Sequence, residues 1–453
     1  MASTPLDSEL TRDLFGTAEM RRVFSEDGQL QAMLDVEAAL ARVQAKLGII
    51  PKAAATAITK AARVENLSAT EIGISTTNVG YPVVALIKGL AKAAGPEAGG
   101  YVHWGATTQD ILDSALVLQM AQGLDIVERD VKAIATALAE KARRHRGDVM
   151  AGRTHLQHAL PITFGYKCAV WLSPLLDHLD RITEIKARVL RVQFGGAVGT
   201  LASLGAEKAH AVTAGLAKEL GLRTPDAPWH VARETVVEAA SFLGLLCGTL
   251  SKIAFDVILL MQSEVAEVFE PHQAGRGGSS TMPQKRNPIA SEYVLATARG
   301  VHALIPLLYN AMAQDQERGT GPWQAEQIAL PQIFVLTSGA LAHGITLAEG
   351  MTVDTARMRK NLDLTGGLIM SEAVMMGLAP KLGRGAAHEL VEHAVNHALK
   401  AKKPLGDILA KSAEVRKHLT EKEIAGLTEP ESYIGEAREV VDRVLARAKR
   451  RLK

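Results

Sequence analysis

Cysteine is almost absent from this sequence, which has only Cys168 and Cys247 among its 453 residues. Two cysteines are too few for a disulfide framework or a cysteine-rich metal cluster. Both lie in apolar helical patterns, which predicts that they belong to the core. No other group of residues has the spacing of metal ligands, and the GRGGSS stretch lacks the spaced G-K-[ST] ending of a phosphate loop. The sequence therefore predicts neither a metal nor a cofactor.

A strong excess of charge is also missing, because 51 basic residues nearly balance 49 acidic ones and leave a net charge of +2. Nucleic-acid-binding proteins usually carry a clear basic excess, so we expect no nucleic-acid partner. The N-terminus lacks the apolar core of a signal peptide. No uncharged apolar run reaches the ~18 residues that a membrane span needs. These absences predict a cytoplasmic protein without a membrane partner.

Alternation with period two is nearly absent, and helical periodicity dominates instead. Residues 33–47 place apolar side chains at steps of three and four, after which Gly48 and Pro51 end the helix. A proline-free segment from Asp113 to about Arg146 repeats the pattern and would form a helix roughly 50 Å long. Further long helical segments span 162–190, where Pro174 predicts a kink, 235–265 and 289–317. The sequence predicts an all-α protein built on a bundle of long helices.

Some of these helices need partners on more than one side. Residues 241–261, SFLGLLCGTLSKIAFDVILLM, are apolar almost all round, so they belong in a bundle core or between subunits. Oligomerisation through the bundle accounts for such a surface. Composition shifts suggest three segments: an N-terminal helical domain (1–112), a central long-helix bundle (113–364) and a C-terminal helical domain (365–453).

Three polar, glycine-bearing stretches interrupt the helices. They read YVHWGATTQD (101–110), GRTHLQHALP (152–161) and GRGGSSTMPQKRNP (275–288). Each mixes hydroxyl, amide or imidazole groups at an expected helix entrance, where unpaired N–H groups and the helix dipole favour carboxylates or phosphates. A single such stretch is typical of a capping loop. Three of them, held apart by long helices, indicate a composite site.

The third stretch, followed by Glu292, resembles the signature of the fumarase/aspartase superfamily: Gly-Ser-Ser-x-Met-Pro-x-Lys-x-Asn and an acid five residues on. GATTQD and GRTHLQHA resemble the two other shared segments of that superfamily, in the expected order along the chain. The resemblance extends over essentially the whole sequence. It implies a homotetramer with a central helical bundle and with each active site assembled from three subunits.

Within the superfamily, several stretches resemble the bacterial 3-carboxy-cis,cis-muconate cycloisomerases. Examples are GYVHWGATTQD, RVQFGGAVGTLASLG, PWHVARE and AEGMTVDTARMRKNLDLTGGL. The resemblance implies an enzyme in which a carboxylate adds across a double bond to close a lactone. A lyase that releases fumarate from an N- or O-substituted succinate is the alternative. A non-catalytic helical scaffold is a third class, which the intact motifs disfavour.

The resemblance also assigns roles to residues of the signature loop. Superfamily reactions pass through a dianionic aci-carboxylate, which calls for cations and preorganised donors. Lys285 and Asn287 would supply them, and Ser280 would carry the proton. A serine hydroxyl is a poor base unless nearby cations favour its alkoxide, and Arg276, Lys285 and Arg286 offer that bias. Without the flanking match, Ser280 would be interpreted as a turn cap and Lys285 as a solvated surface residue.

The second acid/base unit implied by the resemblance pairs His155 with Glu292 of another subunit. A carboxylate held against an imidazole raises its basicity and fixes its tautomer. Some cycloisomerases of this group lack a histidine at this position, so His155 keeps the lyase alternative open. His158 is interpreted as a substrate-facing or structural hydrogen-bonding residue.

The substrate contacts follow from position in the matched segments, and we expect a small di- or tricarboxylate as substrate. Hydroxyl and amide groups would bind one carboxylate, and arginines that align with substrate-binding arginines of relatives would bind others bidentately. For both arginines, exposed helix surface is an equally good interpretation. The predicted contacts are Thr107, Thr108, Gln109, Gln157, Arg233 and Arg318.

Overall fold

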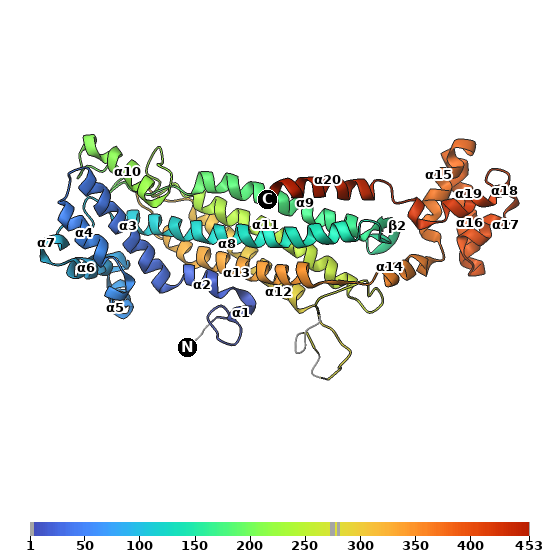
Figure 1. Cartoon of the computed structure of the whole chain (residues 1–453), viewed down its shortest axis with the longest axis horizontal. Helices are drawn as coiled ribbons and strands as arrows, with labels where there is room; N and C mark the ends of the chain where they lie inside the picture. Colours follow the sequence, from blue (N-terminus) through green and yellow to red (C-terminus); the bar gives the residue numbers. More distant parts are fainter. Residues whose placement is uncertain (1–3, 272–276, 279–280, 453) are drawn as a thin grey trace. The chain divides into compact units, whose positions relative to one another are not determined.

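The computed structural model describes residues 4–271, 277–278 and 281–452, and α-helices dominate it (Figure 1). The prediction of an all-α protein is confirmed. The described chain begins with short helices that lead to the first long one. The N-terminal helices are α1 (Arg12–Phe15), α2 (Ala18–Val23), α3 (Glu26–Lys46), α4 (Lys52–Ala61), α5 (Ala69–Val79), α6 (Val83–Ala94) and α7 (Pro96–Gly99).

Five helices of 23 to 37 residues follow; the first four lie close to predicted segments, and the fifth was not predicted. Pro174, Pro306 and Pro331 lie inside three of them. A shorter helix, α10 (Ala206–Leu220), separates the second from the third. The long helices are α8 (Thr108–Arg144), α9 (Phe164–Val189), α11 (Glu234–Leu260), α12 (Ile289–Ala311) and α13 (Pro322–Gly350).

Seven helices of 4 to 18 residues form the described C-terminal part. They are α14 (Thr355–Leu362), α15 (Ser371–Leu382), α16 (Arg384–Ala401), α17 (Leu405–Lys411), α18 (Ala413–Arg416), α19 (Glu421–Leu427) and α20 (Ala437–Arg451). Two short antiparallel strand pairs complete the described fold. They are β1 (Val149–Thr154) with β2 (Gln157–Thr163), and β3 (Val268–Phe269) with β4 (Thr352–Val353).

The chain divides into two compact units, each made of three separate segments. Unit 1 contains residues 1–131, 178–251 and 293–343, and unit 2 contains residues 132–177, 252–292 and 344–453. The boundaries fall within or beside the five long helices. The three consecutive domains expected from composition shifts are therefore a different division of the chain, and they stay a prediction.

Unit 1 has an apolar core among its N-terminal helices. The amphipathic pattern of α3 buries Met33, Leu34 and Val36 completely, and Ser25 caps the helix by accepting a hydrogen bond of 3.1 Å from the Gly28 N–H. Leu86 of α6 and Trp323 of α13 belong to the same core. A second cluster joins α3 to α10 and to residues 192–201, including Phe194. These cores hold the start of α8 in place, where the first polar stretch lies.

Unit 2 has its own apolar clusters. The C-terminal helices α15 to α19 bury Val374, Leu378 and Leu405 completely, and α15 packs against α16 (Figure 1). A smaller cluster joins β1 to residues 362–373. The β1–β2 hairpin is therefore anchored at its base by apolar contacts within unit 2.

Two helices meet the length and composition expected of membrane spans, so the expectation that no segment does is wrong by this criterion. They are α11 and α13. The sequence reasoning counted only uninterrupted apolar runs, whereas the apolar stretch of α11 contains charged residues and that of α13 contains uncharged polar residues and a proline. Half of the most apolar window of α11 and 72% of that of α13 are buried within the protein itself.

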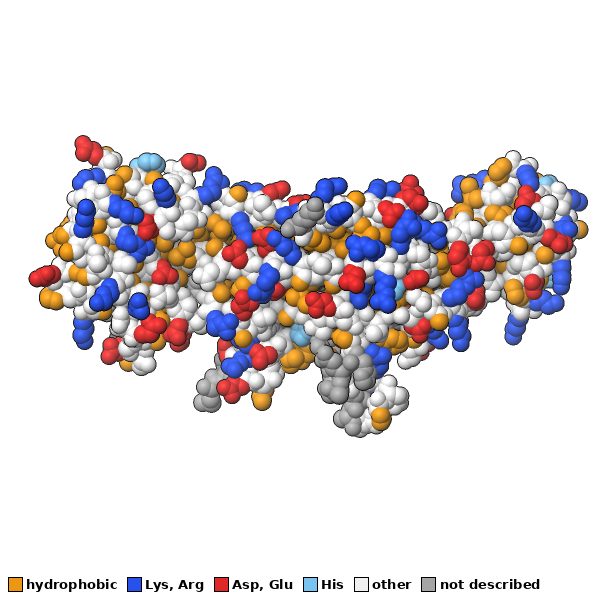
Figure 2. All heavy atoms as spheres, in the orientation of Figure 1, with side chains coloured by type: hydrophobic (Ala, Val, Ile, Leu, Met, Phe, Trp, Pro, Cys, Tyr) orange, Lys and Arg blue, Asp and Glu red, His pale blue; other side chains and the backbone are white. Residues whose placement is uncertain are grey.

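On the face shown in Figure 2, basic and acidic side chains are interspersed, in keeping with the small net charge.

Candidate active site

The first predicted segment lies at the start of α8. Thr108 is the first residue of the helix, and the N–H of Thr107 donates a hydrogen bond of 3.0 Å to the Asp110 carboxylate. Both threonines are partly buried. Their hydroxyls make no hydrogen bond within the described part of the chain, so these hydroxyls remain available to a ligand, as the sequence predicts.

Gln109, the next residue, is completely buried, whereas Thr107 and Thr108 are only partly buried. Its Nε2 donates to the Asp113 carboxylate (3.0 Å) and to the His230 carbonyl oxygen (2.8 Å). Only its Oε1 is without a partner. An amide oxygen is an acceptor and repels a carboxylate. The geometry therefore does not support Gln109 as a carboxylate-binding residue, and favours a role in holding the start of α8.

Arg233 is also completely buried, between two carboxylates. Its Nη1 and Nη2 donate to Asp113 at 2.7 and 3.0 Å, and its Nε donates to Glu326 at 2.8 Å. Its Nη2 also pairs with Glu326, and its guanidinium lies 4.9 Å from the centre of the Trp229 ring. Neither interpretation from the sequence fits. Arg233 is not an exposed helix residue, and two carboxylates already neutralise the guanidinium that was predicted to bind a substrate carboxylate.

The electrostatics of this triad follow from burial. Asp113 and Glu326 are 1% and 2% exposed. Burial raises the pKa of Glu326, and the hydrogen bond and charge of Arg233 partly offset that effect. Burial alone would lower the pKa of Arg233, but the two carboxylates raise it above its ordinary value. The guanidinium is therefore permanently charged, and it is what makes two buried carboxylates tolerable.

Asp110 organises a second polar cluster beside the first. Its buried carboxylate accepts hydrogen bonds from the N–H groups of Gly195 (2.8 Å) and Gly196 (2.9 Å) and from Nε2 of His230 (2.8 Å). Arg318, the other predicted arginine, donates from Nη2 to the Ala197 carbonyl oxygen at 2.9 Å. Sequence reasoning missed Asp110, although it is the last residue of the quoted YVHWGATTQD stretch.

The second predicted segment forms the β1–β2 hairpin in unit 2 and not a helix entrance. His155 and Leu156 are the two turn residues, with φ of 49° and 64°. Two positive φ values in a two-residue turn match the twist of the flanking strands. His155 and Gln157 are exposed at this tip. The turn therefore presents the predicted histidine and glutamine away from their own hairpin.

Behind the tip, the hairpin is fixed by an ion pair. Arg153 binds the completely buried Glu267 carboxylate with two hydrogen bonds, of 2.9 and 2.7 Å. Asn361 donates a further bond of 2.8 Å to Glu267. His158 is paired with Arg153 across the strands. Burial, and then the Arg153 charge, lowers the pKa of His158, which favours the neutral structural role.

The signature loop is described at residues 277–278 and 281–288, and Ser280 and Arg276 lie outside the described residues. Lys285 is exposed, and Asn287 is partly buried with its N–H bonded to the Gly277 carbonyl oxygen at 2.9 Å. Arg286 closes the loop by donating to the Glu270 carbonyl oxygen at 2.8 Å. Lys285 therefore keeps its charge available at the surface of the chain.

Glu270 is a further residue that sequence reasoning missed. Its buried carboxylate accepts from the Ala290 N–H (2.9 Å) and from both the N–H and the hydroxyl of Ser291 (2.8 and 2.7 Å). These are first-turn donors of α12 that the helix itself cannot satisfy. Glu270 thus fixes the end of the signature loop and the turn that carries Glu292.

Glu292 and His155 were predicted to meet across a subunit boundary. Both side chains are exposed. Neither makes a hydrogen bond or ion pair with any described residue of its own chain, so the pairing stays a prediction.

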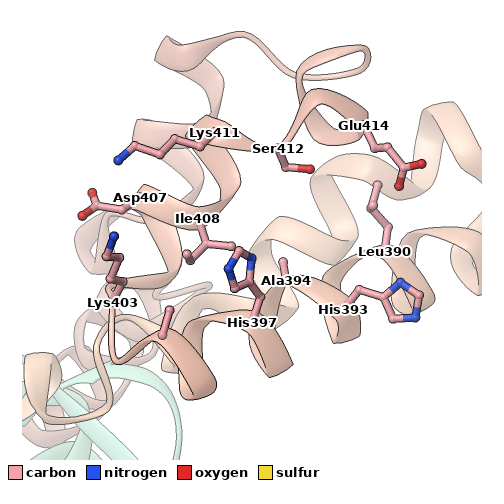
Figure 3. Close-up of a pocket in the computed structure, with 11 residues that line it drawn as sticks. Leu390, His393, Ala394, His397, Lys403, Asp407, Ile408, Lys411, Ser412 and Glu414 are labelled. Carbon is pink, nitrogen blue, oxygen red and sulfur yellow. The ribbon is translucent and has the colours of Figure 1, made fainter.

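A cavity of about 300 Å³ lies elsewhere in unit 2, between α16 and the α17–α18 segment (Figure 3). It contains none of the predicted site residues. Its walls mix exposed groups of both charges with an apolar floor, and Ser412 caps α18. The residues that line the cavity are Leu390, His393, Ala394, His397, Ala401, Lys403, Asp407, Ile408, Lys411, Ser412 and Glu414. Across the described residues, no group of three or more His, Cys, Asp or Glu could hold a metal ion.

Comparisons with known proteins extend over nearly the whole chain. Residues 15–302 match the lyase family, and residues 367–444 match the adenylosuccinate lyase C-terminus. A 3-carboxy-cis,cis-muconate cycloisomerase of Pseudomonas aeruginosa is 47% identical over 95% of this chain and 95% of its own.

Solved structures give the same result. The 3-carboxy-cis,cis-muconate lactonizing enzyme of Pseudomonas putida has a TM-score of 0.93 and 42% identity, covering 98% of this chain and 100% of its own. A fumarate lyase of Mesorhizobium sp. BNC1 has a TM-score of 0.90 and 45% identity, covering 95% and 98%.

Proposed function

Because this chain belongs to the lyase family of the fumarase/aspartase superfamily, we propose that it is a 3-carboxy-cis,cis-muconate cycloisomerase of aromatic degradation. The observation that carries the proposal is its 47% identity, over nearly its full length, to a relative of that name. The structural likeness to a lactonizing enzyme supports the same activity. The intact GSSTMPQKRN segment argues against the scaffold alternative.

The proposed reaction closes a lactone within a single substrate molecule. A substrate carboxylate oxygen forms a bond to one alkene carbon, and the electron pair moves toward the neighbouring carboxylate, which becomes an aci-carboxylate dianion. Ser280 then gives its proton to the other alkene carbon, which bears this aci-carboxylate. Lys285 and Asn287 stabilise the dianion, because charge that develops in the transition state is best met by donors already in place.

The remaining carboxylates need fixed binding groups. The hydroxyls of Thr107 and Thr108, which no described residue engages, lie at the positive end of the α8 dipole, which suits one carboxylate. Arg318 makes no ion pair with a described carboxylate, so its charge is available for another. Gln157, exposed beside His155, is proposed to contribute an amide donor to the substrate.

His155 and Glu292 have a smaller role in this proposal than in a lyase. The nucleophile of lactonisation is a carboxylate, which is already ionised near neutral pH, so it needs no general base. His155 would then position the substrate. In a lyase the departing amine or alkoxide needs a proton, and a histidine held by Glu292 would provide it.

The site is proposed to be shared by three subunits of a homotetramer in the cytoplasm. The side chains of His155 and Glu292 are exposed and have no hydrogen-bond or ion-pair partner within the described chain. On α11, the apolar side chains of Leu245 and Phe255 are 59% and 53% exposed. Burial of these side chains against other subunits would remove apolar surface from water, at about 25 cal/mol per Å².

The second candidate is a lyase that releases fumarate from a substituted succinate. It is favoured by the retained His155 and by 45% identity to a protein called a fumarate lyase. Purified protein tested on 3-carboxymuconate, argininosuccinate, adenylosuccinate and aspartate separates the two by ultraviolet absorbance. Loss of conjugated-diacid absorbance from 3-carboxymuconate alone supports the cycloisomerase. Appearance of fumarate absorbance from any of the others, with no turnover of 3-carboxymuconate, refutes it.

A further inference from the structure

One loop of unit 1 contacts two segments that were predicted independently to bind substrate. It comprises residues 195–200, in the sequence GGAVGT. At its base, the N–H groups of Gly195 and Gly196 donate to Asp110, which also accepts from Thr107. Farther along, the Ala197 carbonyl oxygen accepts from Arg318. The loop therefore joins the threonine segment to the predicted arginine.

The base of this loop is tightly packed. Gly195 and Gly196 are buried, and a Cβ atom on Gly195 would lie 2.9 Å from Pro228 and 3.0 Å from the His230 ring. Gly196 has a φ of 70°, and a Cβ there would lie 3.4 Å from the Gly105 carbonyl oxygen, two residues before Thr107. The base is thus held against the polypeptide that carries the threonines.

Unlike the buried base, the tip of the loop (residues 197–200) lies largely at the surface. Ala197, Val198 and Thr200 are exposed, and Gly199 has a φ of 91°. The N–H groups of these four residues make no hydrogen bond within the described part of the chain. Unpaired N–H groups in succession around a turn with positive φ form a concave set of donors that binds anions. A rigid base therefore presents a donor-rich tip.

Arg318 adds the positive charge that such a tip lacks. Only its Nη2 is engaged by a described residue, and the acceptor is a neutral carbonyl oxygen. Arg233 is the opposite case, because two carboxylates neutralise it. Of the two predicted substrate arginines, Arg318 alone can thus offer an uncompensated guanidinium to a carboxylate, and planar guanidinium groups bind carboxylates bidentately.

We propose that the 197–200 tip and Arg318 form a second carboxylate subsite, next to the one at Thr107 and Thr108. Its ligand is the additional carboxylate that distinguishes a tricarboxylate from a dicarboxylate. This inference rests on the proposed function only in taking a polycarboxylate as substrate. Asp110 is its positioning residue: it does not touch substrate, but its carboxylate fixes the distance between the two subsites.

The test uses two probes that differ by one carboxylate. Propane-1,2,3-tricarboxylate is pentanedioate with a carboxylate added at the central carbon. Binding of each is measured by calorimetry at constant pH and ionic strength. We expect the wild-type protein to bind the tricarboxylate at least tenfold more tightly than pentanedioate. Arg318→Gln should abolish most of this ratio. Equal binding of the two probes by wild type would overturn the proposal.

A matched control separates the subsite from general charge effects. Arg22 is exposed on α2 and makes no contact with the loop among the described residues. Arg22→Gln should leave the ratio unchanged. If Arg318→Gln weakened both probes equally, or if Arg22→Gln reduced the ratio as much, the assignment would be wrong.

The backbone and the positioning residue are tested in the same way. Val198→Pro removes one N–H group from the tip and should lower the ratio, whereas Val198→Ala keeps that group and should not. Asp110→Asn should lower the ratio while Asp110→Glu, which keeps the charge, restores part of it. A full ratio in both Val198→Pro and Asp110→Asn, with folding verified by circular dichroism, would refute both roles. Because binding is measured without turnover, discrimination without activity on 3-carboxymuconate would refute the proposed function and leave this subsite standing.

Discussion

Replacing Arg233 by Met distinguishes a buried structural cation from a substrate contact. The guanidinium is completely buried and holds two carboxylates that are 1% and 2% exposed. Removing one partner of a buried ion pair leaves an uncompensated charge and typically costs about 3–5 kcal/mol. Here two like charges remain, so we expect the upper end of that range. Denaturant unfolding of Arg233→Met against wild type measures the loss.

Arg191→Met is a suitable control for this variant, because Arg191 lies 5.8 Å from the same Trp229 ring but pairs with Glu234 near the surface. Such a partly exposed pair contributes about 0–1 kcal/mol. A small effect of Arg191→Met beside a large effect of Arg233→Met supports the reasoning. If Arg233→Met kept wild-type stability and lost only activity, Arg233 would be a substrate contact, and the reasoning would be refuted.

The pH dependence of the same variant has a defined sign. Burial already raises the pKa of Glu326, and Arg233 opposes that rise. Without the arginine the folded-state pKa rises further above its unfolded value. A carboxyl of this kind contributes stability below its unfolded pKa, and that contribution is lost as pH rises through the folded pKa. Arg233→Met should therefore be less destabilised near pH 5 than near pH 8. Equal losses at both pH values would contradict this account.

The remaining predictions concern turnover on the substrate that the absorbance screen identifies. Ser280→Ala should fold and bind but lose ~10²-fold or more of the rate; if it kept more than about a tenth of wild-type activity, Ser280 would be a capping residue. His155→Ala should lower lactonisation roughly tenfold or less, against ~10²-fold in a lyase, and a severe loss with 3-carboxymuconate would contradict this division of roles. Mixed oligomers of His155→Ala and Ser280→Ala chains should contain sites with neither substitution, so their activity should exceed the average of the two unmixed variants; no gain after verified subunit exchange would place the site within one subunit.

The helices could be predicted because their apolar periodicity is long and regular. The pattern at residues 33–47 belongs to α3, which ends at Lys46, just before Gly48. The predicted helix from Asp113 to about Arg146 is α8, with limits at Thr108 and Arg144. The β1–β2 hairpin could not be predicted in the same way. Its turn residues are His155 and Leu156 rather than the Asn-Gly or Asp-Gly pairs that usually signal two-residue hairpins.

Short motifs allowed candidate site residues to be proposed from the sequence, whereas the contacts that distant residues make with them could not be predicted. Among the described residues, the hydroxyls of Thr107 and Thr108 have no hydrogen-bond partner, and their role in substrate binding stays a prediction from the motif. Arg233 was misjudged because its partner Asp113 is 120 residues away, and nothing in the local sequence announces that contact. Glu270 was missed because it caps a helix that starts 19 residues later, and two of its three hydrogen-bond donors are backbone N–H groups, which every sequence has.

Asp110 and Asp113 lie three residues apart in the first turns of α8, and each anchors a different part of unit 1. One residue inserted between Thr108 and Asp110 would rotate them by about 100° relative to Thr107 and break both anchors together. Deletions there would do the same. The exposed tip at 197–200 has no such constraint on its side chains. Evolution of new substrates on this scaffold, in nature or in a mutant library, should therefore vary the tip and preserve the length of the chain between Thr107 and Asp113.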